Sequence, residues 1–286
     1  MARKTGPPDH RRKPLAEGPE GPVERIRRSL DALGLTHTRE QLEDYLAWAT
    51  REHVSISAVL ERIFSEEAGK KCERAVARRF QQSGLKVEKT LEAFDWNFQP
   101  GLDRAAIFEL ANLDFVRRAD DLVFTGKSGT GKSHILQALA LRGCQQQLFV
   151  RYTSCVDLLD DLYAGLGDGT YPMRLKRWCA PMMLVIDDVG LGQVKMRDDE
   201  PTAAHTLFAL IDKRHTRLST ALSSNIKLSD WGKYLGDATL AAAILDRLAL
   251  RATRIDIDGP SYRQHVAHER ARARGKKSPP EDSSGS

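Results

Sequence analysis

The 286-residue chain has few of the features that mark membrane, secreted or disordered proteins. Its apolar runs stay well short of the ~18 residues that a membrane span needs, and its basic N-terminus has no apolar stretch behind it that would indicate a signal peptide. Apolar residues make up 41% and charged residues 29%, which is too apolar for a disordered chain. We therefore expect a soluble, cytoplasmic protein that has no membrane partner.

Cysteine is scarce, and its spacing excludes two further classes. The four cysteines form no Cys-x-x-Cys pair, so they fit neither a disulfide framework nor a zinc site. They are Cys72, Cys144, Cys155 and Cys179.

Excess positive charge is confined to the two ends of the chain. The net charge is +5, but residues 1–13 and residues 265–277 each carry five basic residues against one acidic residue. Such tails favour weak, salt-sensitive contact with polyanions, although a solvated tail without a partner is an equally good interpretation.

Composition and periodicity change along the chain and predict two folded parts between two tails. Thr38 and Gln41 have the spacing of a capping box, and helically spaced apolar residues follow it. Short apolar strands then alternate with helical stretches, which favours an α/β fold with a parallel sheet flanked by helices. The expected parts are a disordered basic tail (1–23), a small all-helical N-terminal domain (24–88), the α/β domain (89–265) and a flexible tail (266–286). The expected strands are residues 122–124, 148–152, 183–186, 220–223 and 254–257.

One glycine-rich motif identifies the chemistry. Residues 126–133, Gly-Lys-Ser-Gly-Thr-Gly-Lys-Ser, match the P-loop pattern G-x-x-x-x-G-K-[ST] between a predicted strand and a predicted helix. The glycines let backbone N–H groups turn toward a phosphate, and the helix N-terminus adds a partial positive charge. The predicted nucleotide-binding residues are Gly126, Lys127, Ser128, Gly129, Thr130, Gly131, Lys132 and Ser133. Of these, Lys132 is expected to reach the β- and γ-phosphates, and Ser133 is expected to coordinate Mg²⁺.

Two acids follow an apolar strand downstream of this loop. Asp187 and Asp188 end the run that begins at residue 182, and ligands of parallel sheets bind at the carboxyl ends of strands. We expect Asp187, on a strand neighbouring that of the P-loop, to hold Mg²⁺. Asp188 is expected to orient or deprotonate the attacking water.

Two single residues are further catalytic candidates. Asn225 ends the predicted strand 220–223 and could hydrogen-bond a γ-phosphate or the water, although such an asparagine is usually a turn residue. Arg247 interrupts an apolar helix. An arginine there usually pairs with a nearby acid such as Asp246, but it could also act on the nucleotide of an adjacent subunit.

The sequence resembles the AAA+ ATPases, and closely the IstB branch that also contains the DnaC-type helicase loaders. The resemblance runs from residue 90 to residue 263 and includes the P-loop, the segment 89–100, which in that family leads toward the adenine, and the block 219–263. It implies that Asn225 is the sensor 1 residue, that Arg247 is a finger acting in trans, and that Arg263 takes the place of the sensor 2 arginine. It also implies a P-loop AAA+ sheet that binds ATP and Mg²⁺.

The functions of that family imply a hypothesis. IstB-like proteins are transposition helpers that self-associate on double-stranded target DNA and recruit or stimulate a cognate transposase. The second acid here is Asp188, where many AAA+ proteins have glutamate, so we expect slow hydrolysis of ATP to ADP and phosphate. Basic residues between the second and third strands, at Arg174, Lys176 and Arg177, are candidates for DNA backbone contacts.

Three alternatives stay open. A DnaC-like loader would act on a replicative helicase and bind single-stranded DNA. A small-molecule P-loop kinase would need an acceptor pocket and an arginine-rich lid, for which the sequence offers no segment. An interaction protein that uses ATP only as a structural switch would bind nucleotide without turnover.

Overall fold

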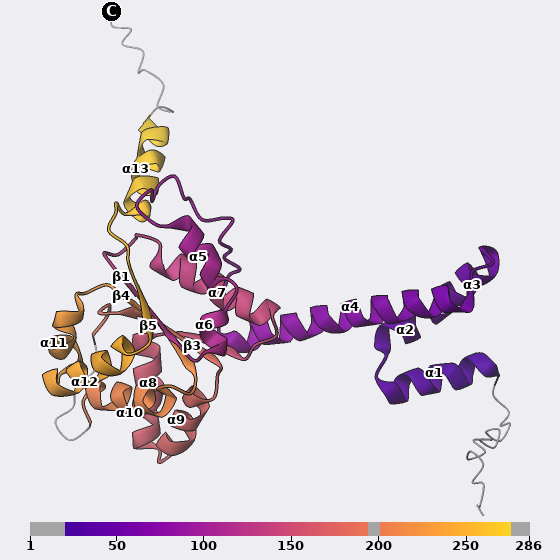
Figure 1. Ribbon diagram of the computed structural model, residues 1–286, viewed down its shortest axis with the longest axis horizontal. Coiled ribbons are helices and arrows are strands. Elements are labelled where there is room, and N and C mark those ends of the chain that lie inside the picture. Colours follow the sequence, from indigo (N-terminus) through magenta and orange to yellow (C-terminus); the bar gives the residue numbers. More distant parts are fainter. Residues whose placement is uncertain (1–20, 194–200, 276–286) are drawn as a thin grey trace, which may run out of the picture. The chain divides into compact units, whose positions relative to one another are not determined.

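The computed structural model describes residues 21–193 and 201–275, which divide into two compact units between Arg74 and Ala75 (Figure 1). Most of the predicted N-terminal tail and residues 276–286 of the predicted C-terminal tail lie outside the described residues. The division falls within one long helix, before the domain boundary that the sequence predicts at residues 88 and 89. Each unit is described by itself.

The first unit is helical, as the sequence predicts. It contains α1 (Pro22–Leu33), α2 (Thr36–Glu40), α3 (Leu42–Arg51) and the first part of α4 (Ile56–Ser83). Its few buried apolar side chains include Leu42 and Tyr45 of α3. Polar contacts add to this packing, since the Tyr45 hydroxyl donates to Glu66 of α4 over 2.6 Å.

The capping box predicted at Thr38 is wrong. Thr38 lies inside α2, and its backbone N–H and its hydroxyl both donate to the buried carboxylate of Glu67, at 2.7 and 2.9 Å. Gln41 occupies the N-cap position of α3 without a side-chain hydrogen bond. A tertiary partner from α4 has therefore replaced the local bond that the spacing suggested.

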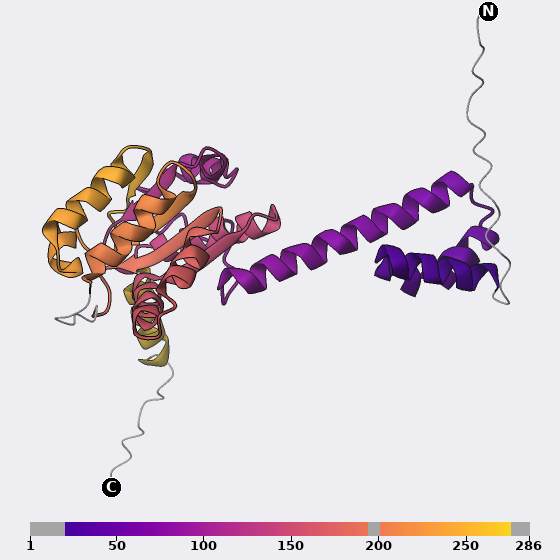
Figure 2. The same ribbon diagram turned by 90° about the horizontal axis from the view of Figure 1, so that it is seen from below.

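The second unit is an α/β layer structure built on five parallel strands (Figures 1 and 2). The strands are β1 (Asp121–Thr125), β2 (Val150–Ser154), β3 (Met183–Val189), β4 (Ser219–Ser224) and β5 (Ala252–Asp256). The helices are α5 (Arg104–Leu110), α6 (Asp114–Arg117), α7 (Lys132–Gln145), α8 (Cys155–Gly167), α9 (Tyr171–Cys179), α10 (Ala203–Arg214), α11 (Trp231–Leu235), α12 (Ala238–Ala249) and α13 (Tyr262–Gly275), with a 3-10 turn at Leu228–Asp230. All five predicted strands are present, with bounds that differ by at most three residues from the predicted ones, which confirms the predicted fold class.

Two apolar layers enclose the sheet, because successive side chains of a strand point to opposite faces. Leu122 and Phe124 of β1 pack with α5, α6 and α7, whereas Val123 packs with the helices from α8 to α12. In β3, Val185 joins the first layer and Ile186 joins the second. With both faces covered, the strands read as continuous apolar runs, and this is why the sequence reveals them.

The strand order corrects one expectation about the site. The order is β2-β3-β4-β1-β5, so β4 lies between the P-loop strand β1 and the strand β3 that carries Asp187 and Asp188. These strands are therefore not neighbours. Sequence order does not reveal that β4 pairs with both of them.

A buried polar network ties β4 to its surroundings at the end where the strand begins. Arg214 is 1% exposed and donates to the carbonyl oxygens of Pro181 and Ser219 and to the hydroxyl of Thr220. The backbone N–H of Thr220 donates to Asp121 of β1 over 2.7 Å. These bonds satisfy a cation that would otherwise be costly to bury.

The helix α13 extends further than the sequence predicts. Residues 266–275, assigned to a flexible tail on their charge, continue the helix that starts at Tyr262. Alanine and arginine are strong helix formers, so their charge does not prevent a helix here. Within the residues that the structure describes, no helix has both the length and the apolar composition of a membrane span.

Burial of Asp121 generates a pH prediction. Burial raises its pKa to about 6, above the ordinary value of about 4. Because the pKa is higher in the folded state than in the unfolded state, protonation of Asp121 stabilises the fold. This contribution to the free energy of unfolding is fully present below pH 4 and is lost as the pH rises through 6. We expect the stability of the wild type relative to Asp121→Asn to increase by about 2 kcal/mol from pH 7.5 to pH 4.5. Thermal unfolding of both proteins across this pH range measures the difference in stability. Stability profiles that run parallel with pH in the two proteins would contradict the prediction.

Candidate nucleotide-binding site

A pocket of about 420 Å³ lies over the carboxyl ends of the central strands. It brings together the P-loop, the ends of β3 and β4, the segment before α5 and the start of α13. Its lining residues are Lys89, Ala93, Phe94, Asp95, Phe98, Gln99, Ser128, Gly129, Thr130, Gly131, Lys132, Ser133, His134, Gln137, Asp188, Asn225, Tyr262 and Arg263. Most of the predicted site residues therefore meet in one place.

The P-loop has a backbone that requires glycine. Gly126, Gly129 and Gly131 have φ values of 141°, 84° and 105°, in the region that side chains disfavour. A Cβ atom at Gly126 would lie 2.2 Å from the carbonyl oxygen of Ile257, and one at Gly131 would lie 2.5 Å from the Phe94 ring. The backbone conformation and the close packing of this loop therefore leave room only for glycine at these positions.

Lys132, at the first position of α7, is 3% exposed. Its Nζ atom donates to the carbonyl oxygens of Gly126 and Lys127, both at 2.7 Å. Burial lowers the pKa of this ammonium group, while the nearby Asp188 and Asp187 act in the opposite direction. The lysine is therefore held inside the loop at the place where phosphates would enter.

A β-bulge gives Asp187 and Asp188 different positions relative to the pocket. The register between β3 and β4 shifts between Ile186 and Val189, and Asp188 takes a positive φ of 61°. Such a bulge places an extra residue on one strand and changes the direction of its side chains. Asp188 consequently lines the pocket, where its carboxylate accepts a 2.8 Å hydrogen bond from the Asn225 amide.

Asp187 is buried beside the pocket and has partners that the sequence analysis missed. The hydroxyls of Tyr152 and Ser223 each donate to it, one to each carboxylate oxygen. Gln137 of α7 donates to the Tyr152 hydroxyl over 2.9 Å. Burial and the charge of Asp187 raise the pKa of Tyr152 well above its ordinary value. In the sequence, Tyr152 could be recognised only as a polar residue at the end of a predicted strand, and such residues are too common to identify a partner of Asp187.

The residues that could hold a metal ion are few. In the described part of the chain, no group of three or more His, Cys, Asp and Glu side chains gathers as a metal site would. A P-loop site needs less, since phosphates and waters supply most of the ligands to Mg²⁺. Ser133 lines the pocket. Oδ2 of Asp187 accepts from Tyr152 alone and retains capacity for a further contact, whereas Oδ1 already accepts from the Ser223 hydroxyl and from the backbone N–H of Asp188.

Aromatic side chains form one wall of the pocket. Phe98, before α5, lies 5.1 Å from the ring of Tyr262 at the start of α13. Arg263 follows Tyr262 and also lines the pocket. The sequence predicted the segment 89–100 as a whole, but it did not identify Phe98 or Tyr262 as wall residues.

Arg247 lies apart from this pocket. It lines a separate hollow with Asp212, His215, Asp246, Ala249 and Leu250. Its ion pair is with Asp212 of α10, at 2.8 Å, and not with the adjacent Asp246. Arg247 therefore does not line the P-loop pocket of its own subunit.

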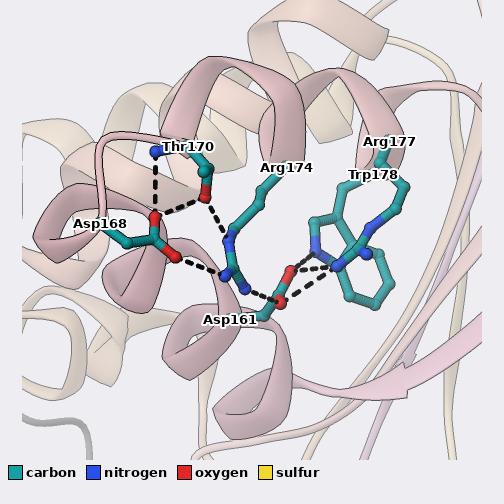
Figure 3. Close-up of polar contacts among 6 residues, drawn as sticks. All are labelled: Asp161, Asp168, Thr170, Arg174, Arg177 and Trp178. Atoms are coloured by element: carbon teal, nitrogen blue, oxygen red, sulfur yellow. Dashed lines mark hydrogen bonds and ion pairs between the residues drawn. The ribbon is translucent and has the colours of Figure 1, made fainter.

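Two of the three basic residues proposed for DNA contact are engaged within the fold. Asp161 of α8 accepts hydrogen bonds from Arg174, Arg177 and Trp178, as Figure 3 shows. Arg174 also pairs with Asp168 at 2.8 Å. These bonds hold α9 against α8, so Arg174 and Arg177 have a structural role that the sequence did not indicate.

The sequence and the fold are both similar to those of known proteins. The sequence profile of the IstB-like ATP binding proteins matches residues 28–270. A putative ATP-binding protein of insertion sequence IS21 from Pseudomonas aeruginosa is 32% identical over 82% of this chain and 86% of its own length. A putative ATP-binding protein of insertion sequence IS5376 from Geobacillus stearothermophilus is 30% identical over 84% of this chain and 94% of its own length.

A solved structure has a similar fold. AMPPCP-bound DnaA from Aquifex aeolicus superposes with a TM-score of 0.51 at 19% identity. The match covers 67% of this chain and 57% of that one. At this identity the likeness shows the AAA+ fold alone.

The close packing of Gly131 leads to a mutational prediction. Gly131→Ala combines an unfavourable φ with a collision against Phe94, so we expect ATP affinity to fall by about tenfold or more. Gly167→Ala is the matched control, because a Cβ atom there meets nothing within 4 Å. Titration with a fluorescent ATP analogue measures both. Unchanged affinity in Gly131→Ala would contradict the proposed placement of the phosphates.

Proposed function

The chain belongs to the family of IstB-like ATP binding proteins, and on that premise we propose that it is an ATPase that assembles on duplex DNA. In this proposal it assists the transposase of an insertion sequence. The observation that carries the proposal is the division of site residues between two places. Lys132, Asp188 and Asn225 meet in the P-loop pocket, whereas Arg247 lies in a separate hollow.

The pocket fits a nucleoside triphosphate. The positive-φ glycines of the loop and the start of α7 would offer N–H groups to the phosphates. Lys132 would exchange its two carbonyl partners for phosphate oxygens, and Phe98 and Tyr262 offer apolar faces near the base. Ser133 and Asp187 would hold Mg²⁺, which supplies charge neutralisation at the phosphates.

Hydrolysis requires a water positioned opposite the leaving phosphate. Asp188 is the acid that lines the pocket, and Asn225 bonds to it at 2.8 Å. We assign Asp188 to orienting the water or accepting its proton, and Asn225 to fixing the direction of that carboxylate. Arg263 would contact the phosphates from the start of α13.

Arg247 would complete the site of a neighbouring copy. An arginine beside the transferred phosphate stabilises its developing charge, and it can be supplied in trans. Because Arg247 lines a hollow away from its own P-loop, self-association would bring it to the next nucleotide. ATP binding would thus favour the oligomer.

Duplex DNA and a transposase are proposed as partners because the similar proteins are named as ATP-binding proteins of insertion sequences. The exposed arginines Arg270 and Arg272 on α13 offer charge for backbone contacts, and the same helix carries Arg263 at the nucleotide pocket. α13 could therefore couple the nucleotide state to DNA contact.

The binding test uses fluorescent duplex and single-stranded DNA of equal length at fixed salt, with ATP, with ADP and without nucleotide. We expect cooperative duplex binding at least about tenfold tighter with ATP than without, because ATP would assemble the subunits that share the DNA. A preference for single strands would instead support a helicase loader. Equal binding in all three nucleotide states would contradict the coupling.

Two variants separate nucleotide binding from the contribution that Arg247 would make to the site of a neighbouring subunit. Lys132→Ala removes a charged phosphate contact and should weaken ATP binding by about 10- to 100-fold. Arg247→Ala should leave ATP affinity within about twofold while lowering DNA-stimulated hydrolysis by about 10³-fold. Nucleotide titration and phosphate release measure these effects. Full turnover in Arg247→Ala would remove the residue from the mechanism.

A further inference from the structure

The guanidinium group of Arg247 is held by two side chains of another helix. Its Nε atom donates to Oδ1 of Asp212 over 2.8 Å, and its Cζ atom lies 4.3 Å from the centre of the Phe208 ring. Both partners lie on α10, which packs against the helix α12 that carries Arg247. A second hydrogen bond joins Nη1 to the carbonyl oxygen of Ala243 on α12 itself, at 3.3 Å.

These contacts restrict the orientation of a planar group. A carboxylate at Nε fixes one edge of the guanidinium plane, and an aromatic ring beneath it fixes one face. Within the described structure, Nη2 has no hydrogen-bond partner. The side chain of Arg247 is 28% exposed and lines the hollow, so it is in part accessible to a group outside the subunit.

The ion pair is poorly explained as a device for stability. The Asp212 side chain is 50% exposed, and pairs this accessible to water contribute little to the free energy of folding. A second acid, Asp246, lines the same hollow without pairing with Arg247. Because Arg247 pairs with Asp212 of α10 and not with the adjacent Asp246 of α12, the ion pair instead determines the direction in which the guanidinium group points.

We propose that Asp212 and Phe208 are positioning residues that orient Arg247 toward the nucleotide of a neighbouring subunit. The inference rests on the proposed function, in which Arg247 acts in trans. Asp212 acts through Arg247 and does not touch the nucleotide. Its loss should lower turnover and leave ATP binding unchanged.

The first test compares ATP affinity and DNA-stimulated hydrolysis in full-length variants. Asp212→Ala and Phe208→Leu should each lower the hydrolysis rate at saturating ATP by about 10- to 100-fold, because a small misplacement of a catalytic group has effects of this size. ATP affinity should stay within about twofold of wild type. Asp212→Glu should recover part of the rate, and Asp246→Asn, the matched control in the same hollow, should match wild type.

Mixed oligomers separate positioning from general damage to the fold. Lys132→Ala has an intact Asp212 and Arg247 but a defective P-loop, whereas Asp212→Ala has the reverse. Mixing the two should raise hydrolysis to at least about twofold above either alone, since a site of the second can then receive an intact arginine from the first. Lys132→Ala mixed with Arg247→Ala is the reference for this rescue.

The outcomes distinguish this inference from the proposed function. If Arg247→Ala is inactive while Asp212→Ala hydrolyses ATP at the wild-type rate, only the positioning role is overturned. Faster hydrolysis in Asp212→Ala would also overturn it, because the pair would then restrain the arginine. Failure of mixing to rescue Asp212→Ala, when Arg247→Ala is rescued, would assign the defect to its own subunit. An active Arg247→Ala would refute the proposed function and this inference with it.

Discussion

The strand β4 pairs with β1 on one side and with β3 on the other, and the whole site depends on that arrangement. The P-loop follows β1, the two acids end β3 and Asn225 follows β4, so a single parallel edge collects residues about a hundred positions apart. Because all three strands are buried on both faces, their positions are fixed by two apolar layers and not by loop contacts. The strand ends that carry the site are therefore held by the core beneath them.

The opposite end of the same strands shows how the arrangement is secured. Arg214 and Asp121 are buried charges that bond to backbone groups at the start of β4 and in the turn before β3. Buried ionic groups are rarely a source of net stability, but they penalise any register that leaves them without partners. We infer that this network specifies the pairing of β4, while the apolar layers supply most of the stabilisation.

Local signals in the sequence were sufficient for the P-loop and for all five strands, because glycine spacing and apolar runs are properties of short segments. They were insufficient wherever a distant partner decides the outcome. Thr38 bonds to Glu67 instead of capping a helix, and Asp187 accepts from Tyr152. The partner of Arg247 is Asp212, 35 positions away, and not its neighbour Asp246. In each case the packing of another element placed a better partner within reach than the chain offered locally.

The bulge in β3 connects the backbone to the chemistry of the second acid. A residue in the left-handed region is disfavoured unless it is glycine, asparagine or aspartate, whose short polar side chains tolerate that conformation. Asp188 has such a φ, 61°, and its carboxylate is already bonded to Asn225. An aspartate at this position thus tolerates the positive φ that directs its side chain into the pocket. The longer side chain of a glutamate would also reach into the pocket, but glutamate does not share this tolerance of the left-handed region. The bulge therefore accommodates an aspartate as the second acid, and the hydrogen bond from Asn225 fixes the direction of its short carboxylate.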